Sequence, residues 1–268
     1  TLGNSAVAGA MTGSVFHLYN FSIAYAVCLL FFFRLRCFDE IKDYATDKSV
    51  NPGRPLARGL LSIDDVKKMF VLVTLVEMVL VSLMGVNAFL VHLAAVAYSY
   101  LMYKEFFIGR YLSPHLTTYA LTHTFVSVLV AFSIFTQMTG MALSTFQPGL
   151  LILGLACWSI FNLFEFARKS FSTEEERKNV PTYTTTFGIS GAVLLSLSQV
   201  VASVLAILYL FKQGAVIDLV DLYGYFVAAS FPLVTGIGFI IFKSRRSAQI
   251  FRATCSAYLI AYYGLLSY

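Results

Sequence analysis

The chain has 268 residues, of which 58% are hydrophobic, 16% aromatic and only 12% charged. A soluble domain carries about 25% charged residues. The mean hydropathy of +0.76 indicates more apolar side chains than one soluble core can bury. These values exclude a secreted disulfide scaffold, a disordered chain and a nucleic-acid-binding domain, although the net charge is +5. The composition therefore predicts an integral membrane protein surrounded by lipid.

Eight apolar segments are long enough to cross the hydrocarbon layer, which takes about 20 helical residues. In chain order they are 15–38, 68–86, 87–107, 115–137, 149–168, 187–211, 221–243 and 250–268. Ser62 and Asp65 have the spacing of a capping box that opens the second of these helices. The pattern predicts an all-α, polytopic membrane helix bundle that forms a single domain over residues 1–268.

Basic residues gather in alternate connections between these segments. Eighteen of the nineteen lie in the first, third, fifth and seventh connections, and the opposite connections contain only Lys212. Basic connections normally stay on the cytoplasmic side of a membrane, so this face is predicted to be cytoplasmic. Most of the acidic residues lie on or near the same face, which a purely structural membrane protein would not require.

Four carboxylates occupy nine residues of the first polar connection: Asp39, Glu40, Asp43 and Asp47. In a continuous helix, Asp39 and Asp43 are four residues apart, and Glu40, Asp43 and Asp47 also share a face. Stacked like charges near lipid repel one another unless cations neutralise them. Oxygen ligands suit Mg²⁺, which commonly also binds the phosphates of a substrate. The spacing therefore favours a metal site built from these four acids.

Basic side chains accompany the four acids and can donate hydrogen bonds to phosphate oxygens. The predicted diphosphate ligands in this connection are Arg36, Lys42, Arg54 and Arg58. The alternative interpretation is a solvated helix end in which acids and bases only pair with each other. Four acids in nine residues at a membrane face favour the binding site.

This segment resembles the first motif of the UbiA superfamily of intramembrane prenyltransferases. The family motif reads N/D-D-x-x-D-x-x-x-D and is followed by a basic stretch ending R-P-x-x-x-G. The chain has D-E-I-K-D-Y-A-T-D from Asp39, then N-P-G-R-P-L-A-R-G. The resemblance implies Mg²⁺ as cofactor, an isoprenoid diphosphate as substrate, and Asp39 and Asp43 as catalytic residues. The family has nine transmembrane helices, with this motif at the end of the second, so its first helix is expected to be absent here.

The family's second motif, D-x-x-x-D, falls on divergent residues. Glu165 and Lys169 occupy the two aspartate positions, and Asn162 lies on the same helical face. The resemblance implies that Glu165 is a catalytic metal ligand, with Asn162 a further candidate, while Arg168 and Lys169 bind the diphosphate. Residues 174–176 are rival acids, but the spacing of Thr173 and Glu176 also fits a capping box at a helix start.

Three functions remain open. The resemblance favours Mg²⁺-dependent transfer of a prenyl group from an isoprenoid diphosphate to an aromatic or lipid-like acceptor. The altered second motif and the high aromatic content also allow a terpene cyclase of the same superfamily, and a non-catalytic transporter or lipid-binding relative is the third interpretation. Several tyrosines could stabilise a carbocation, although tyrosine is also common at membrane interfaces. They are Tyr98, Tyr100, Tyr103, Tyr111 and Tyr119.

Overall fold

The computed structural model describes residues 2–14, 17–177, 180–214 and 217–267. The start of the predicted segment 15–38, the end of 250–268 and the basic residue Lys178 lie outside these ranges. The long helices are α1 (Leu2–Thr12), α2 (Leu18–Lys42), α4 (Ile63–Ser82), α5 (Val86–Tyr103), α8 (Val126–Thr139), α9 (Pro148–Arg168), α10 (Tyr183–Lys212), α11 (Leu219–Phe242) and α12 (Arg245–Leu265). The short elements are α3 (Tyr44–Val50), α6 (Gly109–Leu112), α7 (Leu116–Thr124) and the 3₁₀ turns η1 (Glu105–Phe107) and η2 (Leu143–Thr145).

Six helical stretches in the described ranges are long and apolar enough to cross a membrane: α2, α5, the α7–α8 stretch Leu116–Thr139, α9, α10 and α11. This finding confirms a polytopic membrane bundle. The other two predicted spans overlap α4 and α12, helices of 20 and 21 residues that are not among these six stretches. A count of eight spans therefore stays a prediction.

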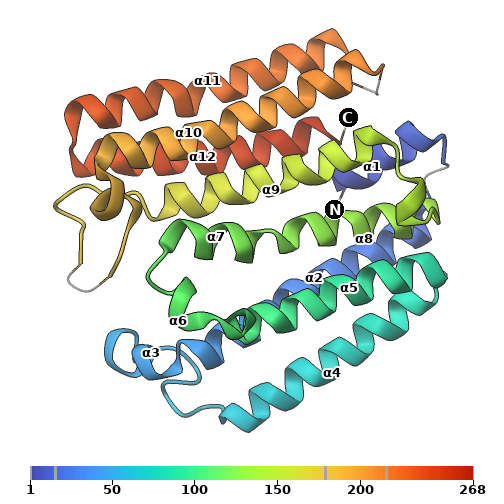
Figure 1. Ribbon diagram of the computed structural model, residues 1–268, viewed down its shortest axis with the longest axis horizontal. Coiled ribbons are helices and arrows are strands. Elements are labelled where there is room, and N and C mark those ends of the chain that lie inside the picture. The colour runs from blue at the N-terminus through green and yellow to red at the C-terminus, as the bar shows by residue number, and fades with distance from the viewer. Residues whose placement is uncertain (1, 15–16, 178–179, 215–216, 268) are drawn as a thin grey trace.

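The helices form a bundle whose polar connections gather at one end (Figure 1). In that view α2, α4, α5 and α8 lie on one side, and α9 to α12 lie on the other. The segment before the first predicted span forms α1, which packs against α8, α9 and α12. The small helices α3 and α6 and the connection from α9 to α10 meet at the same end of the bundle (Figure 1).

Local sequence signals explain several helix boundaries. The predicted capping box is confirmed, because Ser62 accepts a hydrogen bond from the Asp65 amide and the Asp65 side chain accepts one in return. Gly188 has a φ of +71° in the first turns of α10, a conformation that costs glycine little, and it kinks the helix. The predicted span 115–137 is divided at Phe125 into α7 and α8, a break that its uninterrupted hydrophobicity does not indicate.

A buried charged network joins four helices in the middle of the bundle. Arg34 of α2 lies 3.0 Å from the Glu77 carboxylate of α4, and both side chains are completely buried. His92 of α5 places Nε2 3.2 Å from the same carboxylate oxygen and Nδ1 2.9 Å from the Ser133 hydroxyl of α8. Since a buried unpaired charge is costly, these contacts tie α2, α4, α5 and α8 to one arrangement.

We expect Glu77→Ala to lower the free energy of unfolding by about 3–5 kcal/mol, because the substitution leaves Arg34 as an uncompensated buried charge. Asp64 is the matched control on the same helix, since its 3.4 Å pair with Lys67 is exposed. Asp64→Ala should cost less than about 1 kcal/mol. Denaturant unfolding of both variants in one detergent measures the difference, and equal losses would contradict the assigned role of Glu77.

Candidate active site

A cavity of about 510 Å³ lies at the polar end of the bundle, between α2 and α9. Eight of the eleven site residues predicted from the sequence line it: Arg36, Asp39, Lys42, Asp43, Arg54, Glu165, Arg168 and Lys169. The two polar connections, which are more than one hundred residues apart in the sequence, therefore contribute to one site. The other three predicted residues, Glu40, Asp47 and Arg58, are not part of its lining.

The first acidic motif keeps the helical spacing expected from its sequence. Asp43 stands between α2 and α3, and its amide donates to the Asp39 carbonyl over 2.8 Å. The Asp47 amide donates to the Asp43 carbonyl over the same distance. Asp39 and Asp43 consequently face the cavity one helical turn apart, the separation at which two carboxylates can share a cation.

Asp47 has a different environment from the two acids before it. Its side chain is buried and accepts hydrogen bonds from the Asn51 amide over 2.9 Å and from Arg54 over 2.5 Å. The hydrogen bond from Asn51, reinforced by the Arg54 guanidinium, lowers the pKa of Asp47 below its ordinary value. The acid therefore remains ionised and holds Arg54 against the cavity wall.

The other charged residues of the first motif differ in their contacts. Glu40 forms an ion pair with Arg36 one turn earlier on α2. Arg54 lies 3.6 Å from the Asp43 carboxylate in addition to its contact with Asp47. Arg58 is exposed and lies beyond the lining residues. Among the residues that the structure describes, Asp39 forms no hydrogen bond or ion pair through its side chain.

The second motif brings basic residues to the opposite wall. Glu165 forms two ion pairs. Its Oε1 lies 2.9 Å from Nζ of Lys169, and its Oε2 lies 2.5 Å from the Arg168 guanidinium, so both carboxylate oxygens have cationic partners. Asn162, the further metal candidate, is buried outside the cavity lining and accepts a 2.5 Å hydrogen bond from Thr124. The charge at this wall is consequently positive, in contrast to the Asp39 side.

The prediction of a helix start at Thr173 is wrong. Residues 173–175 form a turn, and α10 begins ten residues after Thr173 with a capping box made by Thr182 and Thr185. The Thr185 hydroxyl, at the third helical position, accepts a hydrogen bond from the Thr182 amide. In the usual capping box a glutamate or glutamine side chain accepts this bond. Two of the three rival acids have partners outside the cavity. Glu175 pairs with Arg252 of α12 at 2.6 Å, and Glu176 accepts a hydrogen bond from Thr182.

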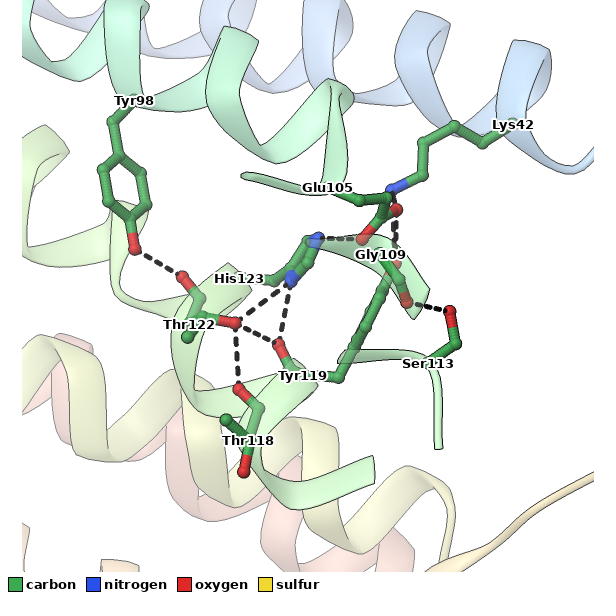
Figure 2. Close-up of polar contacts among 9 residues, drawn as sticks. All are labelled: Lys42, Tyr98, Glu105, Gly109, Ser113, Thr118, Tyr119, Thr122 and His123. Atoms are coloured by element: carbon green, nitrogen blue, oxygen red, sulfur yellow. Dashed lines mark hydrogen bonds and ion pairs between the residues drawn. The ribbon is translucent and has the colours of Figure 1, made fainter. Parts of the chain in front are cut away.

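A polar cluster that the sequence analysis missed borders the cavity (Figure 2). Glu105 forms an ion pair with Lys42, accepts a 3.1 Å hydrogen bond from the Tyr119 hydroxyl, and lies 3.3 Å from Nε2 of His123. The ring of His123 stacks on that of Tyr119 with 3.9 Å between centroids. Lys42, Tyr119 and His123 all line the cavity. Of the five candidate tyrosines, only Tyr119 and Tyr103 belong to this lining.

The backbone that presents Glu105 is strained. Glu105, Phe106 and Phe107 have φ values of +50°, +52° and +58°, a left-handed run without glycine. Each such residue costs about 1–2 kcal/mol, and strain of this kind persists where the surroundings hold it, commonly at functional sites. The ion pair with Lys42 and the edge-on contact of Phe106 with His123 are two of the contacts that hold this turn.

Magnesium fits the acids of this cavity only together with a substrate. Within the described ranges, no three His, Cys, Asp or Glu side chains are gathered as a ready metal site. Magnesium usually takes one or two carboxylates and completes its octahedral shell with water and substrate phosphates. Asp39 and Asp43 face a wall of cations that would hold those phosphates, so this donor set suits a magnesium ion delivered with a diphosphate.

The model of the UbiA prenyltransferase family matches residues 4–262 of the chain. The chain belongs to the UbiA family. This membership and the helices long enough to cross a membrane support an integral-membrane prenyltransferase, as the first acidic motif and the helical bundle predict. This UbiA protein also resembles a solved structure described as digeranylgeranylglyceryl phosphate synthase in membranes, with a TM-score of 0.71 over 99% of this chain and 92% of that one. The two chains are 13% identical, so this likeness concerns the fold. No curated protein sequence matches the chain significantly.

We expect the Glu175–Arg252 pair of this UbiA protein to give acid-sensitive stability. The hydrogen bond from Arg252 lowers the pKa of Glu175 below its ordinary value of 4.5. A lowered pKa stabilises the fold above the ordinary pKa, and this contribution disappears as the pH falls through the lowered value. Thermal unfolding should show that Glu175→Gln is less stable than the native protein at neutral pH and that the gap closes in acid. Glu174→Gln, in the same turn, should leave the profile unchanged, and a gap that persists in acid would contradict the assignment.

Proposed function

We propose that this UbiA protein is a Mg²⁺-dependent enzyme that transfers a prenyl group from an isoprenoid diphosphate to an aromatic or lipid-like acceptor. One observation carries the proposal: the carboxylates of Asp39 and Asp43 and five basic side chains from both polar connections line one cavity. The basic connections gather at the same end of the bundle, which by the positive-inside rule supports a cytoplasmic location for this cavity.

The basic residues would bind and stabilise the departing diphosphate. When the carbon–oxygen bond of an isoprenoid diphosphate breaks, its electron pair leaves with the diphosphate, and cations fixed beforehand stabilise that charge. Arg168 and Lys169 each keep further N–H donors after binding Glu165, since guanidinium has five and ammonium has three. Glu165 would then orient two diphosphate ligands, which gives it a positioning role in place of the metal-binding role expected from the family motif.

Magnesium, held by Asp39 and Asp43, would supply further charge neutralisation for the same leaving group. Next to the polar wall, the cavity is lined by aromatic side chains including Phe32, Phe38 and Phe161. An allylic cation needs a site from which water is excluded, and aromatic faces can stabilise it through cation–π contact. The polar and aromatic walls of this one cavity thus match the two ends of an isoprenoid diphosphate.

A terpene cyclase is the second candidate function. The same site would ionise the substrate, and the carbocation would close on its own double bonds instead of meeting an acceptor. The half-buried Glu105–His123 contact beside the cavity favours keeping this candidate, because a cyclisation that ends in an alkene must return a proton to a nearby base. Diphosphate release from purified protein without any acceptor distinguishes the two: release with a cyclic product supports the cyclase, and release only after an acceptor is added supports the transferase.

We expect Asp39→Asn and Asp43→Asn each to reduce Mg²⁺-dependent turnover by at least about 100-fold, because each removes a charged ligand that the proposed metal requires. Asp64→Asn is the control, an exposed acid that pairs with Lys67 outside the cavity. Initial rates across a magnesium titration measure the effect. Full activity in Asp43→Asn would overturn the metal assignment.

Lys169→Asp should weaken binding of the diphosphate substrate by about tenfold or more and raise the magnesium concentration needed for activity, because it replaces a charged donor by an acid. Arg177→Asp makes the same change of charge at an exposed position in the same connection and should alter neither quantity greatly. Substrate KM and magnesium dependence are measured together. Unchanged values in Lys169→Asp would remove this residue from the proposed site.

A further inference from the structure

A second, deeper cavity of about 140 Å³ lies inside the bundle, among α1, α2, α8, α9 and α12. Its lining is mainly apolar and includes Val130, Ala131 and Ile134 of α8. Two residues, Phe32 and Phe161, line both this chamber and the 510 Å³ cavity that contains the acids. The two cavities therefore meet at this pair of aromatic rings.

Phe32 and Phe161 stack on each other across the bundle, and the side chain of Phe32 is 37% exposed. Phe32 belongs to α2 and Phe161 to α9, and their rings are stacked with centroids 6.0 Å apart and planes inclined by 4°. Phe32 precedes Asp39 by seven residues, and Phe161 precedes Glu165 by four, so each ring shares a helical face with an acid of the site. At 1.5 Å of rise per residue, the rings lie roughly 6–10 Å deeper in the bundle than these acids.

We propose that the Phe32–Phe161 stack is the floor of the prenyl-binding pocket and limits the length of the isoprenoid chain that the protein accepts. This inference rests on the proposed function, since the polar wall must first hold the diphosphate. A chain that starts at the acids and runs inward meets the two rings before it can enter the chamber. The chamber beyond would enlarge the space by about a quarter if the stack were opened.

The chamber can receive hydrocarbon once the floor is removed. Apolar cavities in proteins stay dry and bind apolar molecules, and most of this wall is apolar. Among its polar contributors, the Cys157 thiol donates to Asn4 over 3.5 Å, whereas the Ser127 hydroxyl is buried and has no hydrogen-bond partner among the described residues. Replacing either phenylalanine by alanine should therefore lengthen the apolar pocket without introducing a buried charge.

The test measures binding of unreactive thiolo-diphosphate analogues of geranyl, farnesyl and geranylgeranyl diphosphate, at fixed Mg²⁺, to purified full-length variants in one detergent. We expect Phe161→Ala and Phe32→Ala to shift the ratio of affinities by about tenfold or more toward the longer analogues, since even one accommodated methylene can change discrimination that much. Adding Ala131→Leu to Phe161→Ala should restore the native preference, because leucine refills the chamber.

Two matched controls lie outside both cavities: Phe33→Ala on α2 and Phe164→Ala on α9, whose side chains are 45% and 42% exposed. They should leave the affinity ratio within about twofold of the native value. If Phe32→Ala and Phe161→Ala bind all analogues with an unchanged ratio of affinities, the stack does not limit chain length, while the proposed function stands. Binding of no analogue by the native protein overturns both. If Phe161→Ala does not fold, Phe32→Ala tests the same contact from the other helix.

Discussion

Neutralisation of carboxylates at the membrane face is the constraint on which this site depends. Glu40, Glu105 and Glu165 each contact a basic side chain, and Asp47 is held by Arg54. A carboxylate buried without a cation is destabilising by several kcal/mol, so these pairs stabilise the polar end before any substrate binds. In the part of the chain that the structure describes, Asp39 lacks such a partner, and Asp43 has only the 3.6 Å contact with Arg54. The acids with the weakest direct pairing thus lie where a metal–diphosphate complex would bind.

The same constraint accounts for the divergent second motif. Two aspartates at these positions would bring two negative charges, whereas Glu165 with Arg168 and Lys169 carries a net positive charge. Charged nitrogen donors can bind phosphate oxygens directly. In the proposed function, the exchange of an acid for Lys169 would therefore keep the attraction for diphosphate while lowering the need for a metal ion at this wall. It also explains why the two walls of the cavity differ in charge.

The sequence predicted the parts of the site that follow from periodicity along one helix. Asp39 and Asp43 are four residues apart, and Glu165 lies four before Lys169, so their common faces could be derived without coordinates. The cluster around Glu105 could not be found this way. Its partner His123 is eighteen residues away in another helix, and the left-handed run that presents Glu105 contains no glycine to reveal it. The helix start at Thr173 is wrong because spacing alone does not distinguish this capping pattern from the capping box of Thr182 and Thr185, where α10 begins.

Helical register links the charged end of the site to its proposed apolar floor. Because Phe32 lies two turns before Asp39 and Phe161 one turn before Glu165, the same rotation of α2 and α9 that turns the acids toward the cavity also turns both rings inward. The exposed neighbours Phe33 and Phe164 lie on other faces of these helices. Rotating either helix to separate the rings would withdraw its acid as well. The length of the apolar pocket and the position of the proposed diphosphate are therefore coupled through the two helices, whereas a change of side chain at Phe32 or Phe161 would alter the pocket alone.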